Sequence, residues 1–476
     1  MFYYGDAEAH WNIAREILDS RTPGYDLIGT VWLPLPHLLL MPLARVDAWW
    51  RSGMSAAFPS AGAFVTAGAF LFCSVRRVFD SVAAAAASTA LFAANPNVLY
   101  LQSIPMSEAV FWASLMALLY CTVRFRQTPG WGFAAAAGIA CLVGTLARYE
   151  AWFLIPFVAA YLAVCARRRK LAGAALFGVL ASLGPVYWLA HNWWVAGDPL
   201  EFYRGPYSPL AIQGSALYPG RGNWPLALLY YRTAAELCAG VGLWWMGLAG
   251  IPAVLFKRVL WPLVLLVLPG AFYVWSMHSA ATPIFVPTLW PNTFYNTRYG
   301  LAVLPLLAVS SAGLVAVLPR PAQAAGAVAV IAAGSIYWAI HIDPENWITW
   351  KESRVNSDTR REWVRQAAEY LAPRYRQGAG VITASGEFRA VFRQAGIPLR
   401  ESFTVDNGLP WLAAVRRPDL FLYEEWALVM GGDAAQSSIN RAGRYGIRYR
   451  LEKTIIVKDS PVIEIYRRIG GKHGSA

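Results

Sequence analysis

Long apolar segments joined by short turns constrain the fold of this chain more than any other feature. Ten segments have close to the length and apolar character of a membrane span, at 56–75, 80–94, 107–123, 131–147, 151–166, 171–190, 239–256, 259–277, 299–318 and 322–340. A helix needs roughly 17–25 apolar residues to cross the hydrocarbon core of a bilayer. The pattern therefore predicts an α-helical polytopic membrane protein.

The composition agrees with this fold class. Hydrophobic residues make up 57% of the chain and charged residues 14%, whereas soluble domains are about one quarter charged. The 22 Trp and 23 Tyr suit aromatic belts at the two membrane interfaces. The net charge of +13 is explained by basic membrane loops, so we expect no nucleic-acid partner.

Basic residues mark every second connection between the apolar segments. They lie at Arg76-Arg77, Arg124-Phe125-Arg126, Arg167-Arg168-Arg169-Lys170, Lys257-Arg258 and Arg320. These connections hold 11 of the 20 Lys and Arg before residue 341 but only one acid, Asp80. Because short cytoplasmic loops carry the excess of Lys and Arg, these connections are predicted to be cytoplasmic and the alternate ones to lie on the outer face.

This orientation predicts three segments. Residues 1–55 form an outer acidic loop with interfacial helices at 6–20 and near 32–50, and residues 56–340 form the transmembrane domain. Residues 341–476 form an outer α/β domain, with a helix at 359–375 and strands at 379–384, 420–423, 449–457 and 462–466. A true span at 31–50 is the alternative, and it would invert every later loop.

The position of the N-terminus adds one expectation. Ten spans followed by an outer C-terminal domain require an outer N-terminus, yet the acidic segment begins only a few residues into the chain. A polar segment of this length does not cross a membrane unaided. We therefore expect a further span before residue 1.

Strongly polar residues occur on each connection predicted to be outer. They are Asp6 and Glu8, then Glu108, Arg148 and Glu150, Arg204, and Arg298 with Tyr299. Ionisable groups near membrane depth are energetically costly and usually mark functional sites. Structural alternatives exist for four of these residues. Asp6 suits a helix N-cap, Glu108 suits the first turn of a helix behind a Ser107 cap, and Arg148 with Glu150 suits an interfacial ion pair.

At these residues the chain resembles the glycosyltransferase-C superfamily, polytopic enzymes that use polyprenyl-phosphate-linked sugars. It is most similar to bacterial relatives of dolichyl-phosphate-mannose-protein mannosyltransferases and of lipid A aminoarabinose transferases. The resemblance covers about residues 1–340. It rests on Gly5-Asp6-Ala7-Glu8-Ala9-His10 with Ala14-Arg15, Pro105-Met106-Ser107-Glu108, Arg148-Tyr149-Glu150, and Asn296-Thr297-Arg298-Tyr299 leading to Leu304-Pro305.

The resemblance implies transfer of a sugar to an acceptor hydroxyl, with inversion at the anomeric carbon. It maps the essential acid onto Asp6, which would act as the base, with Glu8 and Glu108 as second candidates. Arg298, Arg148 and Arg204 are the candidates for stabilising the leaving phosphate, and Tyr299 could add a hydroxyl contact. Superfamily members place this acid after a first span, which agrees with the span expected before residue 1.

The cofactor and the partners follow from the same resemblance. An Asp-x-Glu pair at Asp6 and Glu8 could hold a divalent cation, and the question of a metal stays open. The expected partners are membrane lipids, a polyprenyl-phosphate sugar donor carrying a hexose or pentose, and a glycan, lipid or protein acceptor. The expected location is the bacterial inner membrane, with the C-terminal domain on the periplasmic or extracellular side.

A lipid or sugar transporter without transferase activity is the competing interpretation. Transporters tend to bind substrate near the bilayer midplane and often show paired repeats. Here the ionisable residues cluster on the predicted outer face, and no clear two-half repeat is visible. These two observations favour the enzyme.

Overall fold

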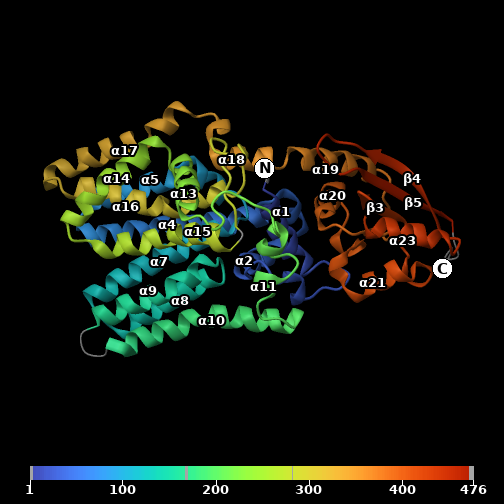
Figure 1. Ribbon diagram of the computed structural model, residues 1–476, viewed down its shortest axis with the longest axis horizontal. Coiled ribbons are helices and arrows are strands. Elements are labelled where there is room, and N and C mark those ends of the chain that lie inside the picture. Colours follow the sequence, from blue (N-terminus) through green and yellow to red (C-terminus); the bar gives the residue numbers. More distant parts are fainter. Residues whose placement is uncertain (1–3, 167–169, 281, 471–476) are drawn as a thin grey trace. The chain divides into compact units, whose positions relative to one another are not determined.

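The computed structural model describes residues 4–166, 170–280 and 282–470, and the chain divides into two compact units (Figure 1). One unit comprises Met1–Ile28, His37–Ala56 and Asn356–Ala476, and the other comprises Gly29–Pro36 and Ala57–Val355. We call them the mixed unit and the helical unit. The division into 1–55, 56–340 and 341–476 stays a prediction.

The helical unit is built from helices of very different lengths. They are α4 Met54–Phe79, α5 Val82–Ala93, α6 Pro96–Gln102, α7 Ser107–Gln127, α8 Trp131–Thr145, α9 Glu150–Cys165, α10 Lys170–Ala196, α11 Glu201–Arg204, α12 Pro209–Gln213, α13 Trp224–Ala239, α14 Val241–Phe256, α15 Leu260–Ser279, the 3-10 helix η2 Thr297–Val303, α16 Leu304–Ala316, α17 Gln323–Ile340 and α18 Ile348–Val355.

Length and apolar composition identify the membrane helices. Among the described residues, 6 helices are long and apolar enough to cross a membrane, or up to 8 if the bent pairs α5 with α6 and α13 with α14 each form one span. The bend between α13 and α14 is 112°, at Gly240, whose φ of 77° suits glycine. Within this unit α8 packs against α7 and α10, and α14 packs against α16 (Figure 1).

Close approach of α14 to α16 depends on a small residue. A Cβ atom at Gly250 would lie 1.9 Å from the carbonyl oxygen of Ser310. Association of membrane helices relies on such small residues, because lipid offers no hydrophobic driving force between helices. Gly250 is therefore one of the small residues that allow this short interhelical distance.

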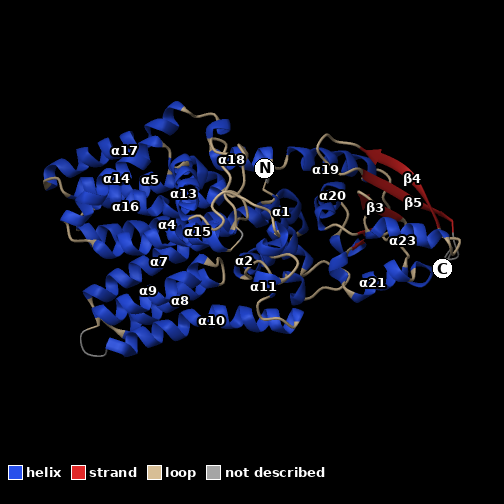
Figure 2. Ribbon diagram, in the orientation of Figure 1, coloured by secondary structure: helices blue, strands red, loops and turns tan. Residues whose placement is uncertain are grey.

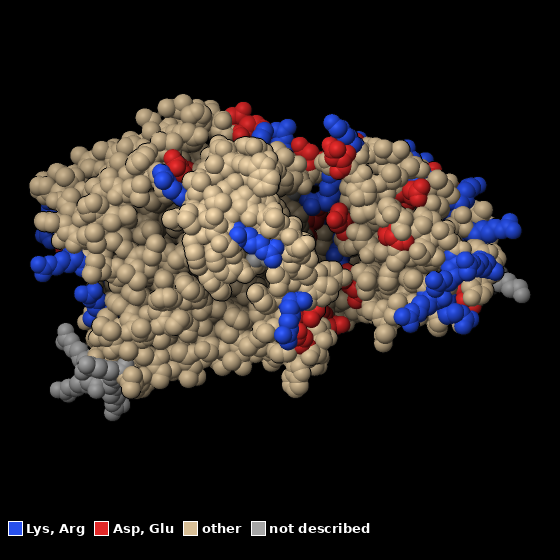
Figure 3. All heavy atoms as spheres, viewed as in Figure 1, with Lys and Arg blue, Asp and Glu red and all other residues tan. Residues whose placement is uncertain are grey.

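Helix α7 carries acidic and basic side chains at opposite ends. Helix α7 carries Glu108 in its first turn and Arg124 and Arg126 in its last turn. In Figure 3, Lys and Arg gather at the left end of this unit, next to a broad surface with few charges. Arg167, Arg168 and Arg169, which the sequence also assigns to a basic turn, lie outside the described residues.

The mixed unit joins short helices from both ends of the chain to a sheet. Its elements are α1 Gly5–Glu16, the 3-10 helix η1 Tyr25–Ile28, α2 Leu35–Ala44, α3 Asp47–Ser52, α19 Asp358–Leu371, β1 Val381–Thr383, α20 Arg389–Ala395, the 3-10 helix η6 Leu399–Glu401, β2 Ser402–Phe403, α21 Leu409–Arg416, α22 Pro418–Phe421, β3 Trp426–Met430, α23 Ala434–Gly443, β4 Arg448–Ile455 and β5 Ile463–Gly470. One of the boundaries between the units falls within α2, after Pro36.

Five strands form one mixed sheet in the order β2-β1-β3-β5-β4 (Figure 2). Strand β1 pairs in parallel with β2 and β3, whereas β5 pairs antiparallel with β3 and β4. Successive residues of β1 face opposite sides, so Val381 and Ile382 enter different hydrophobic clusters. The predicted α/β domain is confirmed, but the strand expected at 420–423 is wrong, because Pro418 starts the helical turn α22 there.

The N-terminal helices share a hydrophobic core with the C-terminal domain. Trp11 of α1 and Trp50 of α3 are fully buried in one cluster with Trp363 of α19, Phe392 of α20 and Trp426 of β3. The alternative of a single span at 31–50 is not formed, since α2 has 10 residues and α3 begins separately at Asp47. Segments more than 300 residues apart in the sequence therefore fold as one body.

Candidate active site

Five charged side chains meet at one end of the helical unit. The helices place them there, because α7 begins at Ser107 and α9 begins at Glu150, while the short connection between α8 and α9 carries Arg148. Carboxylates in the first turn of a helix are stabilised by the positive end of the helix dipole. Arg298 comes from η2 and Glu352 from α18.

Two local features hold η2 in place. Asn296, just before the 3-10 helix, has a φ of 54°, a conformation that Asn tolerates better than most residues. Its side-chain amide donates to the carbonyl of Pro283, and the Thr297 hydroxyl donates to the carbonyl of Phe285. At Gly300 a Cβ atom would lie 2.4 Å from the backbone of Ala234, so η2 packs directly on α13.

Arg148 is bonded on every side. Its Nε donates to Glu150 Oε1 at 2.5 Å, its Nη1 lies 3.0 Å from Glu108 Oε1 and 2.7 Å from the Ser107 hydroxyl, and its Nη2 lies 2.6 Å from the Tyr273 hydroxyl. Tyr273 in turn donates to Glu150 Oε1 at 2.7 Å. Burial lowers the pKa of the Arg148 guanidinium, but Glu108 and Glu150 outweigh burial and raise this pKa well above its usual value. Arg148 therefore stays charged.

Arg298 makes longer contacts with carboxylates. Its Nε lies 3.2 Å from Glu108 Oε1, and its Nη1 lies 3.9 Å from Glu352 Oε1. Both guanidiniums lie over the ring of Tyr299, with 5.2 Å from Arg298 and 5.4 Å from Arg148 to the ring centroid. Glu108 thus bridges two arginines through one oxygen, while its buried Oε2 accepts no hydrogen bond from the described residues.

We call Glu108, Arg148, Glu150, Arg298 and Glu352 the ionic cluster. Each of the three carboxylates is at most 5% exposed, and Arg298 is 6% exposed. Buried charges are stable only when they are paired and hydrogen-bonded, and removing one partner leaves the other charge uncompensated. The expected Arg148–Glu150 ion pair is therefore present, as part of a larger network.

The acidic turn at Asp6 and Glu8 belongs to the mixed unit. Tyr4 precedes α1 and Asp6 lies within its first turn, so the N-cap interpretation of Asp6 is wrong. Asp6 is half-buried. Glu8 Oε1 accepts from Arg393 Nη2 at 2.8 Å, and its Oε2 lies 3.8 Å from Arg360 Nη2.

Solved structures match the fold of this chain over most of its length. A crystal structure of ArnT from Cupriavidus metallidurans in the apo state matches with a TM-score of 0.57 and 13% sequence identity, over 96% of this chain and 93% of that chain. A second structure of the same protein, bound to undecaprenyl phosphate, matches with a TM-score of 0.56 and 13% identity, over 96% and 92%. This chain has the glycosyltransferase-C fold.

A family model agrees with this assignment. The model described as dolichyl-phosphate-mannose-protein mannosyltransferase matches residues 50–194, a range that includes Glu108, Arg148 and Glu150. No curated protein sequence matches the chain. The resemblance to the glycosyltransferase-C superfamily is therefore confirmed.

The glycosyltransferase-C fold brings together only some of the predicted site residues. Glu108, Arg148, Arg298 and Tyr299 meet in the helical unit, and Asp6 and Glu8 lie in the mixed unit. Arg204 of α11 pairs with Asp198 at 2.5 Å and is 57% exposed, and no contact described here joins it to the ionic cluster.

Sequence reasoning missed two members of this network. Glu352 follows the last apolar segment in Trp350-Lys351-Glu352-Ser353, where charge is common and carries no signal. Tyr273 lies inside an apolar helix, where its hydroxyl was the only feature of the sequence that could have indicated a polar contact. Among the described residues, no group of three or more His, Cys, Asp or Glu is arranged to hold a metal ion, and Glu8 is already paired with arginine.

Proposed function

We propose that the protein is a membrane glycosyltransferase that moves a sugar from a polyprenyl-phosphate donor to an acceptor hydroxyl on the outer face. The observation that carries the proposal is the buried ionic cluster, in a fold shared with an ArnT structure that binds undecaprenyl phosphate. A lipid-linked donor leaves a phosphate, and planar guanidinium groups stabilise phosphate charge well.

We propose different roles for the two arginines, on the basis of their contact distances. Arg148 is bound by two carboxylates and two hydroxyls at 2.5–3.0 Å, which suits a framework residue. Arg298 has longer carboxylate contacts, at 3.2 and 3.9 Å, which suit a guanidinium that also binds a phosphate. We assign donor-phosphate binding to Arg298, with Tyr299 beside it and Glu108 and Glu352 holding its guanidinium.

The reaction is one displacement at the anomeric carbon. The acceptor oxygen forms a bond to this carbon as the bond to the phosphate oxygen breaks, and the electron pair leaves with the polyprenyl phosphate. The acceptor proton passes to the Asp6 carboxylate. No covalent enzyme intermediate forms, so the anomeric configuration inverts.

The test uses the full-length protein in lipid nanodiscs, with a panel of hexose and pentose polyprenyl phosphates. Wild type should release polyprenyl phosphate from one of them in the presence of an acceptor extract. Asp6→Asn should lower kcat by at least about 100-fold, since a general base contributes about 10²–10⁴-fold. Full activity of Asp6→Asn would rule out its role as base.

Phosphate binding is measured separately. Arg298→Gln should weaken binding of undecaprenyl phosphate about 10-fold or more, because a charge-assisted contact contributes about 1.5–3 kcal/mol. Arg320→Gln is the matched control, since Arg320 is 84% exposed and pairs with Asp80. Equal affinity of wild type and Arg298→Gln would remove Arg298 from the donor site.

A further inference from the structure

The acidic face of α1 is bound by arginines that the C-terminal domain supplies. Glu8 meets Arg393 at 2.8 Å, Glu16 meets Arg389 at 2.7 Å, and Asp19, just after the helix, meets Arg400 at 2.9 Å. All six residues belong to the mixed unit. The tail domain therefore contacts the helix that carries Asp6 along its whole length.

The contacts at the start of α1 are largely shielded from solvent. The Glu8 and Arg393 side chains are 13% and 14% exposed, and Arg360 is 20% exposed. The Arg393 guanidinium also lies 4.4 Å over the ring of Trp11, which is fully buried. Ion pairs with restricted solvent contact are screened less than surface pairs. These ion pairs can therefore hold the first turn of α1 in one position.

Arg360 closes over the first residue of the helix. A Cβ atom at Gly5 would lie 2.7 Å from Arg360 Nη1, so the guanidinium rests directly on the backbone next to Asp6. Glu8 follows Asp6 by two residues, and a helix turns about 100° per residue, so the two side chains leave α1 on nearly opposite sides. The contact at Glu8 is therefore made on the side of α1 that faces away from the Asp6 side chain.

We propose that Arg360 and Arg393 are positioning residues for Asp6, acting through Glu8. These three residues, Glu8, Arg360 and Arg393, form the arginine clamp. Glu8 then serves as an anchor and not as a second base or a cation ligand. The inference rests on the proposed role of Asp6, and it gives the C-terminal domain a part in the transfer reaction. Displacement of a catalytic group by about 1 Å can cost about 100-fold in rate.

The test is a double-mutant cycle on the full-length protein. Glu8→Gln and Arg393→Gln should each lower kcat about 10- to 100-fold while the KM for the donor changes less than about 2-fold. The kcat of the double variant should be no lower than that of the less active single variant, because both changes remove the same interaction. Arg393→Lys keeps the charge and should recover part of kcat.

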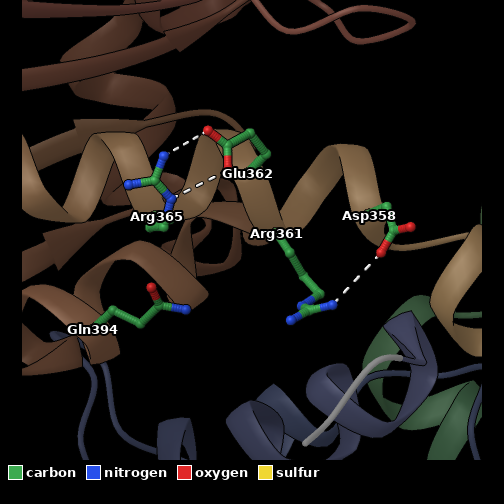
Figure 4. A pocket seen from close by; sticks show the side chains of 5 residues that line it. All are labelled: Asp358, Arg361, Glu362, Arg365 and Gln394. Carbon is green, nitrogen blue, oxygen red and sulfur yellow. Dashed lines mark hydrogen bonds and ion pairs between the residues drawn. The ribbon is translucent and has the colours of Figure 1, made fainter.

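Arg365 provides the control, because it lies on α19, the helix that also carries Arg360. It lines a surface hollow of about 400 Å³ with Asp358, Arg361, Glu362 and Gln394, and Figure 4 shows it paired with Glu362. Arg365 is 51% exposed and lies 2.6 Å from Glu362 and 2.8 Å from Glu369. Arg365→Gln removes an arginine from α19 without touching the described contacts of α1, so kcat should stay at the wild-type value.

The outcomes separate this proposal from the proposed function. If wild type transfers sugar and the clamp variants have the same kcat, the clamp has no positioning role. The same conclusion follows if the losses of kcat in the two single variants add in the double variant. If wild type transfers no sugar, the proposed function fails, and hydrogen exchange of the α1 amides decides for the clamp. Faster exchange in both single variants, without a further increase in the double variant, supports it. Unchanged exchange overturns it.

Discussion

At the scale of single residues, Glu108 holds the ionic cluster together. One of its oxygens neutralises both Arg148 and Arg298, at 3.0 and 3.2 Å. Neither arginine can lose its proton in a protein. The charge on Glu108 is therefore the least replaceable in the network, although its side chain is of nearly the same size as Gln.

We expect Glu108→Gln to destabilise the helical unit by about 3–5 kcal/mol, the usual cost of breaking a buried ion pair. The measurement is the denaturant midpoint of the full-length protein in detergent. Asp80→Asn is the control, because the Asp80 side chain is 91% exposed and its pair with Arg320 should contribute about 0–1 kcal/mol. Equal destabilisation by the two substitutions would contradict the bridging role.

Glu16 gives a pH-dependent prediction in the mixed unit. Burial raises the pKa of Glu16 above its usual value of 4.5, and attraction to Arg389 offsets only part of this effect. Between pH 4.5 and the raised pKa, the Glu16 carboxyl therefore holds more protons in the folded chain than in the unfolded chain. The stability that Glu16 contributes is complete below this pH and is lost as the pH rises through the raised pKa.

Glu16→Gln cannot ionise, so its Tm should fall less than that of wild type as the pH rises from about 4 to about 7. The check is a series of thermal unfolding curves across this range for both proteins. Parallel dependence of Tm on pH in the two would show that Glu16 does not titrate in this window.

At the scale of elements, the sequence predicted features that depend on local pattern better than features that depend on packing between distant segments. The ten apolar segments each coincide with a helix, because apolar length is a local property. The 112° bend between α13 and α14 and the place of α18 were not predictable. Asn97 of α6 accepts from both the amide and the hydroxyl of Thr349, and no local pattern indicates a partner 252 residues away.

The same reasoning applies to the candidate site. Glu108, Arg148 and Arg298 were visible in the sequence as charges next to apolar segments, and they do meet. The bond from Arg148 to Tyr273 and the contact of Arg298 with Glu352 join elements far apart in the chain. The acids of α1 were equally visible, but their arginine partners come from a domain in which arginine is common.

One glycine tests the packing of helices. Gly250→Ala should destabilise the helical unit by about 1–3 kcal/mol, because its methyl group would force α14 away from the Ser310 backbone of α16. Gly178→Ala in α10 is the matched control, since nothing lies within 4 Å of its Cβ position. That change should be neutral or stabilise by up to about 1 kcal/mol. The measurement is resistance to denaturation in detergent, and similar effects of both changes would contradict the close packing.

At the scale of the whole molecule, the distribution of charge predicts the topology. The basic ends of α4, α7 and α14 should face the cytoplasm, and the sheet of the mixed unit should face the periplasm or cell exterior. Alkaline phosphatase fused after Gly470 should be active, because it folds only outside the cytoplasm, and a fusion after Arg258 should be inactive. The reverse pattern would place the ionic cluster on the cytoplasmic side.

The pairing of α1 with the tail domain also determines the order of assembly. Arg393 follows its partner Glu8 by 385 residues, so α1 is synthesised first but finds its partners only when nearly the whole chain has been made. Until then Glu8 and Glu16 lack these arginine partners, and Trp11 can pack only against neighbours from the N-terminal segment such as Trp50. The contacts of α1 are thus completed late in synthesis, and we expect a chain that stops before residue 389 to lack arginine partners of Glu8, Glu16 and Asp19.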